Sequence, residues 1–347
     1  MSNIVIIGAG ITGISSALTI QKKFPNAKIT IIADKFSPFI TSDVAAGFWW
    51  PYLVNFPNPD LLNRICRDTF NYISSLVEKE DAGAMWQSGY EVNRELTEIP
   101  HWAPLVRGFR RLNEDELNQL GEGYKSGQFF TTLALEPTTY IAYATKEFLS
   151  KGGIIKQGKV ENLVDLTGSF DVVVNCSGLG ARDLVGDKQV SPIRGQIIRV
   201  RAPRVKHFFC DGDYYCLLNS NCVILGGTHD EGEWNMEVNQ DTAKKILEEN
   251  IKRTPELKGA EIISHHVGLR PFRSSLRLEK ETIRNTNGRE VDPFLFCVNE
   301  LFVDHCNPQL RSWRIGNHSL LGMCTPCCRI DWKWKSSSID VHTVDKM

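Results

Sequence analysis

The pattern of apolar and polar positions over residues 3–33 predicts a strand, a helix and a second strand. Asn3 to Gly8 is a short apolar run rich in β-branched residues, which is typical of a buried parallel strand. A helical stretch follows and ends near Lys22 and Lys23, and a second apolar run occupies Lys28 to Ala33. This order of elements predicts the first βαβ unit of an α/β sheet.

Further along the chain, helical periodicity alternates with short strand patterns. Apolar residues at helical spacing predict helices over residues 61–77, 137–149 and 241–253, and a short capped helix over 113–120. Apolar runs predict strands over residues 129–135, 151–156, 159–163 and 170–175. From Arg194 onward the pattern alternates, which predicts a second, largely antiparallel domain inserted within the first.

Size and composition are those of a globular enzyme. The chain has 347 residues, which is long for one ordinary hydrophobic core and predicts two domains. Lys and Arg number 40 against 41 Asp and Glu, so no charge excess points to nucleic acid or a membrane surface. No apolar stretch approaches the ~20 residues of a membrane span. Ten cysteines without a recognisable secretion signal predict reduced thiols that lie mostly in the core.

A glycine-rich turn links the first strand to the first helix. Gly8, Gly10 and Gly13 have the spacing Gly-x-Gly-x-x-Gly. Gly8 permits a tight turn, Gly10 lets the backbone approach a pyrophosphate, and Gly13 lets helix and strand pack closely. The helix N-terminus offers N–H groups to phosphates, and Asp34 follows the second strand where a ribose hydroxyl needs an acceptor. A ligand with an ADP moiety, either FAD or NAD, is therefore predicted; a glycine turn without a ligand is the alternative.

A second run of small residues follows the strand predicted at residues 170–175. It extends from Cys176 to Ala181 and includes Gly178 and Gly180. Small residues after a buried parallel strand let a dinucleotide approach the backbone a second time. This element favours FAD over an NAD-dependent dehydrogenase.

Several separate motifs occur in order along the chain. They are Gly8-Ala-Gly, Thr41-Ser-Asp-Val-Ala-Ala-Gly, Gly195-Gln-Ile, Leu225-Gly-Gly-Thr and Val267-Gly-Leu-Arg-Pro-Phe-Arg. With these motifs the chain resembles the D-amino-acid oxidase and D-aspartate oxidase family of flavoproteins from Asn3 to about Arg284, and residues 175–187 are most similar to the D-aspartate branch. The resemblance implies an α/β fold with a Rossmann-like FAD-binding domain and an interleaved, mainly antiparallel α+β substrate domain.

The expected division of the chain is discontinuous. The FAD-binding domain is expected to comprise residues 1–52, 132–190 and about 272–300. The substrate domain is expected to comprise residues 53–131 and 191–271, and residues 301–347 form an atypical tail.

The resemblance implies FAD as cofactor and assigns its contacts. Gly8, Gly10 and Gly13 match the family's phosphate-binding turn, and Asp34 and Lys35 match its ribose and adenosine contacts. The residues that match contacts along the phosphates, the flavin and the adenine are Thr41, Ser42, Gly47, Phe48 and Val160. From the sequence alone, residues 35–52 could equally form a loop and core.

The implied reaction is hydride transfer from the Cα of a D-amino acid to the flavin, followed by hydrolysis to a 2-oxo acid and ammonia and by reoxidation with oxygen to peroxide. Arg270 matches the family's carboxylate-binding arginine, whose planar fork can hold a carboxylate through two parallel hydrogen bonds. Tyr215 matches the tyrosine that supports this carboxylate. Without the resemblance, Arg270 could be an ion-pair residue and Tyr215 a core aromatic.

Two positions depart from the pattern of D-aspartate oxidases. Where we match the arginines suited to a second substrate carboxylate, this chain has Cys210 and His229. A histidine has an unperturbed pKa of about 6.5 and carries a charge only conditionally. Overall similarity favours D-aspartate and D-glutamate as substrates, and a neutral D-amino acid is the alternative.

The sequence after residue 300 departs from the family altogether. Cys306 to Arg314 can be encoded by TGT AAT CCA CAA CTA CGG TCA TGG CGG. Read one base later, these bases give Val-Ile-His-Asn-Tyr-Gly-His-Gly-Gly, which resembles the segment that closes the family's flavin site. We therefore predict that the chain leaves the family's reading frame between about Pro293 and Cys306, through splicing, a gene-model error or a frameshift. An isoform unable to close its flavin site is then a further alternative.

The same tail bears on metal binding and location. The cluster of Cys324, Cys327 and Cys328 is a candidate for binding zinc. A structural zinc site needs a second pair of ligands at regular spacing, and the sequence has none, so no metal is predicted. Family members are commonly peroxisomal through a C-terminal tripeptide. This chain ends in Asp345-Lys-Met, which is no such address, so this product is expected to be cytoplasmic. The expected partners are a small D-amino acid and oxygen, and the sequence does not indicate an oligomeric state.

Overall fold

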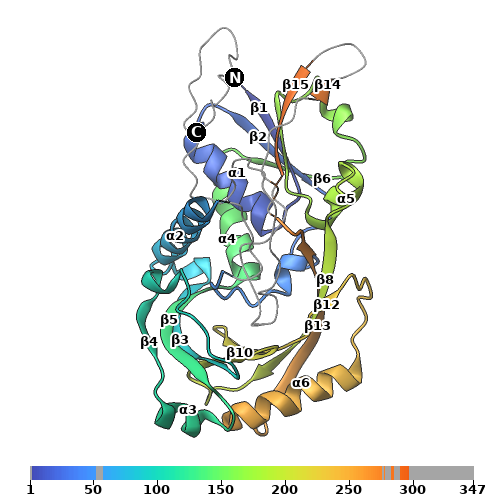
Figure 1. The fold of residues 1–347 in the computed structure, drawn as a ribbon. Coiled ribbons are helices and arrows are strands. Elements are labelled where there is room, and N and C mark those ends of the chain that lie inside the picture. Colours follow the sequence, from blue (N-terminus) through green and yellow to red (C-terminus); the bar gives the residue numbers. More distant parts are fainter. Residues whose placement is uncertain (1, 52–57, 276, 278–282, 285–289, 297–347) are drawn as a thin grey trace.

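Two β-sheets organise the chain (Figure 1). The computed structural model describes residues 2–51, 58–275, 277, 283–284 and 290–296, with the backbone alone in the last two ranges. Sheet A and its helices form one end of the molecule, and sheet B forms the other end, with the helix Gln240–Arg253 along its outer side.

Sheet A has six strands among the described residues, in the order β14-β15-β7-β1-β2-β6. Its strands are parallel except β14, which is antiparallel to β15. The bounds are β1 (Asn3–Ile7), β2 (Lys28–Ala33), β6 (Ile154–Gln157), β7 (Val172–Asn175), β14 (Ile283–Arg284) and β15 (Glu290–Phe296). The parallel ladder confirms the βαβ unit expected from the first apolar runs, with Val5 opposite Thr30 in register.

Both faces of β1 are covered, which explains its unbroken apolar sequence. Ile4 and Ile6 pack in one cluster with Ile11 and Ile14 of α1 (Ile11–Lys23). The alternate residues of the strand point the other way, toward the 3₁₀ turn Leu163–Leu166. Two further helices lie on the same side of sheet A as α1, namely α4 (Pro137–Ser150) and α2 (Pro59–Leu76).

Sheet B has nine described strands in the order β12-β8-β11-β10-β9-β3-β5-β4, with β13 on the other side of β8. It is antiparallel apart from the pair β3–β9. The bounds are β3 (Ala84–Asn93), β4 (Arg107–Arg111), β5 (Ser126–Leu135), β8 (Ser191–Arg201), β9 (Phe208–Asp211), β10 (Tyr214–Leu218), β11 (Val223–Gly226), β12 (Asp230–Glu231) and β13 (Glu261–Phe272).

The two faces of sheet B serve different purposes. Alternate residues such as Ile198, Val200 and Leu225 pack under α6 (Gln240–Arg253). The opposite face carries Ile197 and Ile224 and belongs to the cluster that also contains the helices of sheet A. Because successive side chains of a strand alternate in direction, one face of sheet B packs against α6 and the other face packs on the side of sheet A.

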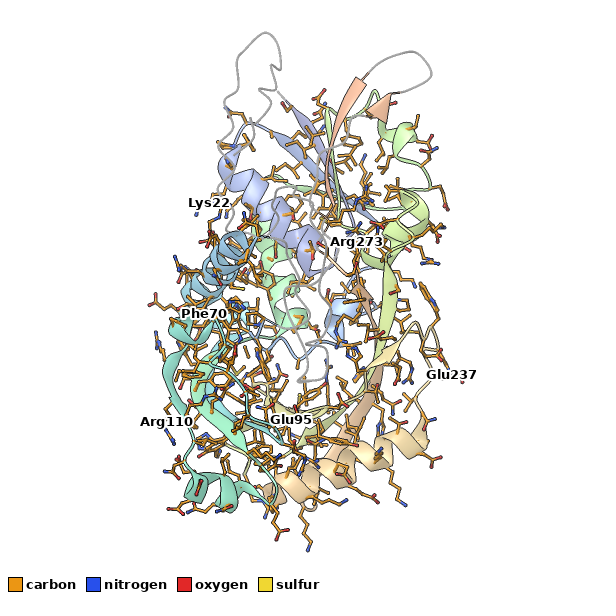
Figure 2. All side chains as sticks on the ribbon, in the orientation of Figure 1. Lys22, Phe70, Glu95, Arg110, Glu237 and Arg273 are labelled. Atoms are coloured by element: carbon orange, nitrogen blue, oxygen red, sulfur yellow. The ribbon has the colours of Figure 1, made fainter. Side chains whose placement is uncertain are left out.

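Short helices and turns complete the described chain. They are α3 (Glu114–Leu120), α5 (Ala181–Leu184) and the 3₁₀ turns Thr41–Asp43, Glu80–Ala82, Ala103–Leu105, Leu163–Leu166, Gly178–Gly180 and Pro255–Leu257. Arg273 lies between the two sheets in Figure 2, and its Nε is 3.2 Å from Oδ2 of Asp187. Nη1 of Arg277 lies 3.0 Å from the same carboxylate oxygen, so this ion cluster connects the end of β13 to the loop after α5.

The fold class predicted from the sequence is confirmed, and the predicted helices lie within two residues of the observed ones. The strand predicted at residues 159–163 is wrong. Asn162 instead caps a 3₁₀ turn, because its Oδ1 accepts from the N–H of Val164 at 2.9 Å. Pattern analysis did not identify β3, since polar residues interrupt its apolar positions; Ser88 is one of them and bonds Thr131 of β5 at 2.7 Å.

The domain division remains a prediction. Sheet A draws its strands from residues 3–33, 154–175 and 283–296, and sheet B from residues 84–135 and 191–272. The predicted change of reading frame falls between about Pro293 and Cys306, and apart from residues 293–296 of β15 this stretch lies outside the described residues, as do the cysteines of the tail. Within the described part of the chain no cysteine forms a disulfide; the cysteines there are Cys66, Cys176, Cys210, Cys216 and Cys222.

Candidate functional site

The glycine turn after β1 is built by close backbone contacts. Gly8 has φ of +102°, and a Cβ there would lie 2.4 Å from the carbonyl oxygen of Cys176. A Cβ on Gly13 would lie 2.0 Å from the carbonyl oxygen of Gly8. Both positions therefore exclude any side chain, as the sequence predicted for a tight turn and for close helix–strand packing.

The N-terminus of α1 is open toward the end of sheet A. Its N-cap is Gly10, which has no side chain to cap the helix, and the first turn contains no acidic residue. The N–H of Ile11 donates to Oγ of Ser42 at 3.2 Å. The helix thus directs the positive end of its dipole toward the glycine turn, the arrangement that binds phosphate in nucleotide folds.

The 3₁₀ turn Thr41–Asp43 holds Ser42 at this helix end. The buried Asp43 carboxylate accepts from Ser37 Oγ at 2.5 Å and from the N–H of Ile40 at 3.0 Å. Oγ1 of Thr138, on α4, donates to the same carboxylate at 3.1 Å. These bonds make the turn part of the layer beside sheet A, so Thr41 and Ser42 lie beside the glycine turn although the chain separates them.

Asp34 and Lys35 follow β2 directly and are exposed. Their position at the carboxyl end of a parallel strand is the one in which open sheets contact a ribose. The side chain of Val160 packs in the cluster that contains Ile32, so its backbone alone is available to a ligand.

Gly47 and Phe48 form a short link to sheet B. Gly47 has φ of +73°, and a Cβ there would lie 1.9 Å from the carbonyl oxygen of Leu135. Phe48 is 1% exposed, and its ring centroid lies 4.8 Å from that of Phe208. The phenyl group is therefore part of the aromatic core, and Phe48 can contact a cofactor through its backbone only.

Arg270 lies where sheet B meets the nucleotide-binding turns. It is on β13, two residues after Gly268, and a Cβ on Gly268 would lie 3.0 Å from Cβ of Val44, next to the Ser42 turn. A Cβ on Gly178 would lie 3.9 Å from Cγ of Pro271. Both loops expected to bind the dinucleotide therefore approach β13 on either side of Arg270.

The guanidinium of Arg270 has unused hydrogen-bonding capacity. Its Nη1 is buried and has no hydrogen-bond partner among the residues that the structure describes. A Cβ on Gly195 of β8 would lie 3.8 Å from Nη2 of Arg270, so this glycine lies beside the guanidinium. A buried cationic donor without a protein acceptor is costly unless a ligand supplies the acceptor.

Tyr215 lies on the same face of sheet B as Arg270. In the ladders Tyr215 is opposite Gly226, and Gly195 is opposite Gly268. Counting along β11, β8 and β13 in steps of two places Tyr215, Gly195 and Arg270 on one face. The hydroxyl-bearing ring is 1% exposed.

His229 is close enough to Arg270 for the charge of the arginine to act on it. Its side chain is only 9% exposed, and its Nε2 lies 3.4 Å from Oε1 of Glu231. Burial, followed by the positive charge of Arg270, lowers the pKa of His229 below its ordinary value, although Glu231 and Asp213 oppose this. The imidazole is therefore mainly neutral near pH 7.

Cys210 is opposite Tyr215 in the β9–β10 ladder and is 1% exposed. Its thiol is part of the large core cluster and presents no cation. The Tyr215 ring packs against Gly226, and Asn250 donates to the carbonyl oxygen of Gly226. The sequence did not indicate these contacts, because only pairing between strands and packing under α6 bring the three residues together.

The chain fits a bound dinucleotide at the end of sheet A. Besides the helix end and the glycine turn, two buried polar atoms at the end of β7 have no hydrogen-bond partner among the described residues, Nδ2 of Asn175 and Oγ of Ser177. Asn175 ends the strand, and Ser177 belongs to the run of small residues that follows it. In the described part of the chain no cluster of three or more His, Cys, Asp or Glu side chains could hold a metal ion. No described helix is long and apolar enough to cross a membrane.

The arrangement defines a two-sheet oxidoreductase of the dinucleotide-binding class, and comparisons specify it further. The model of the FAD dependent oxidoreductase family (DAO) matches residues 3–295. The D-aspartate oxidase of Homo sapiens is 39% identical over 297 residues, which are 83% of this chain and 86% of the human protein. The D-amino acid oxidase of Dugesia ryukyuensis is 36% identical over 290 residues, 82% of this chain and 87% of its own length.

A solved structure with the same fold is the glycine oxidase of Bacillus cereus. It has a TM-score of 0.66 and 17% identity and covers 86% of this chain and 89% of its own chain. The protein therefore belongs to the FAD dependent oxidoreductase family. The expectation of FAD as the cofactor is confirmed at the level of the family.

Proposed function

We propose that this protein catalyses the oxidative deamination of D-amino acids, with FAD as cofactor and oxygen as acceptor, to a 2-oxo acid, ammonia and hydrogen peroxide. Relatives at 39% and 36% identity are named D-aspartate oxidase and D-amino acid oxidase. One structural observation carries the proposal: a buried nitrogen of Arg270 lacks a partner among the described residues and lies on the sheet face that meets the nucleotide-binding turns.

In this proposal Arg270 binds the α-carboxylate of the substrate. A guanidinium can donate two parallel hydrogen bonds to a carboxylate, which fixes the orientation of the group as well as its position. With the carboxylate held in this way, the Cα–H bond keeps a defined direction toward the end of sheet A.

In this proposal the hydroxyl group of Tyr215 donates a hydrogen bond to the same carboxylate. The side chain is almost completely buried and comes from the same sheet face as Arg270, so a bound carboxylate would be removed from water on both sides. Hydrogen bonds to a charged acceptor in such surroundings are the stronger ones.

The nucleotide-binding contacts remain proposals too. They are Gly8, Gly10, Gly13, Asp34, Lys35, Thr41, Ser42, Gly47, Phe48 and Val160. Bound FAD would supply the acceptor for the hydride that leaves Cα. The chain itself supplies orientation and charge, and a substrate amine that arrives neutral needs no side-chain base.

We further propose that a neutral side chain is preferred to a second carboxylate. His229 lies beside Arg270 but is held neutral, and the carboxylates that face it are Glu231 and Asp213. A substrate such as D-aspartate would meet the negative charge of Glu231 and Asp213 there. D-Aspartate remains the second candidate, because the human relative at 39% identity is a D-aspartate oxidase.

The absorption spectrum of the purified protein tests the reaction. We expect two flavin bands near the blue end of the visible range, and bleaching when D-alanine is added without oxygen. L-Alanine is the matched control and should leave the bands unchanged. A protein that takes up FAD but is reduced by no D-amino acid would disprove the proposal, and a protein that cannot take up FAD would favour the impaired isoform.

The preference is tested by kcat/KM for D-alanine, D-methionine and D-aspartate at pH 7.5. We expect the neutral substrates to be the better ones and His229→Arg to improve D-aspartate, with His229→Asn as the uncharged control. A higher kcat/KM of the wild-type enzyme for D-aspartate than for D-alanine and D-methionine would refute the proposed preference for neutral side chains. Location is a separate proposal: we expect this protein in the cytoplasm, and imaging beside a peroxisomal marker would test this against the peroxisomal location common in the family.

A further inference from the structure

The ring of Tyr215 lies directly against the backbone of the next strand. Gly226 is its partner across the antiparallel pair β10–β11. A Cβ on Gly226 would lie 1.8 Å from Cζ of Tyr215 and 2.0 Å from its hydroxyl oxygen. The phenol can therefore occupy its observed position only because residue 226 has no side chain.

Gly226 is itself held by a buried side chain of α6. Nδ2 of Asn250 donates to the carbonyl oxygen of Gly226 at 2.9 Å and to that of Ile246 at 2.9 Å. Asn250 is 1% exposed. One carboxamide thus joins the helix to the end of β11, immediately behind the residue on which the Tyr215 ring rests.

The last turn of α6 also holds the strand on the other side of Tyr215. Nε of Arg253 lies 2.7 Å from Oδ2 of Asp211 on β9. The guanidinium lies 4.6 Å from the ring centroid of Tyr214. The helix therefore contacts both neighbours of β10 by polar side chains, although it packs on the face of the sheet opposite to the site.

We infer that Gly226 and Asn250 are a positioning pair for Tyr215, and that they set the place of its hydroxyl and so the affinity of the enzyme for the substrate carboxylate. The inference rests on the proposed role of Tyr215. Asn250 touches no reacting atom, and its effect on the reaction passes through the Gly226 carbonyl and the ring above it.

A purely structural role of Asn250 predicts a different result. A buried amide that only ties α6 to β11 would lower the stability of the protein when replaced, while KM stayed the same. A positioning role raises KM and depends on the Tyr215 hydroxyl. A double-mutant cycle separates the two, since residues that act through one another give non-additive effects.

The experiment uses the FAD-loaded enzyme and the substitutions Asn250→Leu and Gly226→Ala, each with and without Tyr215→Phe. Leucine keeps the branched shape at Cγ but removes both donors. We expect each substitution alone to lower kcat/KM about tenfold, mainly through KM, as for the loss of one strong hydrogen bond. In the Tyr215→Phe background we expect less than a twofold further change.

Asn113→Leu is the control, because it also removes a hydrogen bond between an asparagine side chain and the backbone, at the exposed cap of α3, an element that does not contact the Gly226 carbonyl. It should lower thermal stability and leave KM unchanged. Equal effects of Asn250→Leu in both backgrounds, or an unchanged KM, would overturn the inference alone. Absence of turnover in the wild-type enzyme would overturn the proposed function and the inference together. Asn250→Leu decides the question even if Gly226→Ala does not fold.

Discussion

Replacing Arg270 by methionine should remove efficient turnover without loss of stability. The side chain is half-buried, and its Nη1 has no hydrogen-bond partner among the described residues. A cation in this situation costs free energy in the absence of substrate, and that cost disappears with the charge. Methionine fills a similar volume, so we expect the melting temperature to stay the same or rise.

The loss of activity follows from the two hydrogen bonds that a guanidinium can donate to a carboxylate. Hydrogen bonds to charged groups contribute about 1.5–3 kcal/mol each. Loss of both removes about 3–6 kcal/mol, which is about 10²- to 10⁴-fold in kcat/KM at 1.4 kcal/mol per tenfold change. Arg270→Lys keeps the charge but lacks the planar guanidinium, so the loss of one hydrogen bond should lower kcat/KM about 10- to 100-fold.

The assay combines oxygen consumption, reduction of the flavin without oxygen, and thermal unfolding of each variant. Arg201→Met is the matched control, because Arg201 lies on the same sheet in an ion pair whose side chains are 63% and 66% exposed. It should change neither rate nor stability appreciably. Activity of Arg270→Met within threefold of wild type would refute the assignment. Loss of activity together with stability would show that Arg270 is a structural residue.

Three further predictions concern the cofactor, pH and the second sheet. Gly13→Ala should prevent folding of the turn, since its Cβ would lie 2.0 Å from a backbone oxygen, whereas Gly10→Ala should fold and bind FAD more weakly. Burial lowers the pKa of His229 and of His266 in the folded protein. As the pH falls below about 6.5, the unfolded chain therefore binds protons at these histidines before the folded protein does. Urea denaturation should accordingly show a free energy of unfolding that decreases toward pH 5. Asp211→Asn should cost about 3 kcal/mol in the same assay, because it breaks a buried ion pair.

For each of these three predictions, one result would contradict it. A yellow, stable Gly13→Ala protein would show that the turn can open. Unfolding free energy that is constant between pH 7 and pH 5 would contradict the neutral histidines, and His266→Gln should flatten the pH profile of the wild type. A cost for Asp211→Asn no larger than that of Glu261→Gln, in an exposed pair, would show that the buried cluster contributes little.

The glycine turn proposed to bind the cofactor was predicted from the sequence because its geometry is local, whereas the other proposed contacts, Lys35, Thr41, Ser42, Gly47, Phe48 and Val160, came from the family resemblance. Gly8, Gly10 and Gly13 lie within one turn, and the strand, helix and acid that give them meaning are consecutive along the chain. The φ of +102° at Gly8 and the tight approach of Gly13 follow from those few residues. For the same reason the amphipathic helices were predicted almost to their ends, whereas β3, with polar residues satisfied across the sheet, was not.

The substrate half depends on contacts between distant segments. Sequence analysis alone left Arg270 as an ion-pair candidate and Tyr215 as a core aromatic, and their places on one face result from pairing among β10, β11, β8 and β13. Whether His229 carries a charge is set by burial and by Arg270, which lies 41 positions further along the chain. Local sequence therefore predicts the glycine turn and the helix end, whereas only the fold brings the Ser42 turn and Cys176 against them. Long-range pairing and burial decide what Arg270, Tyr215 and His229 can do, because desolvation and neighbouring charge depend on residues that only folding brings together.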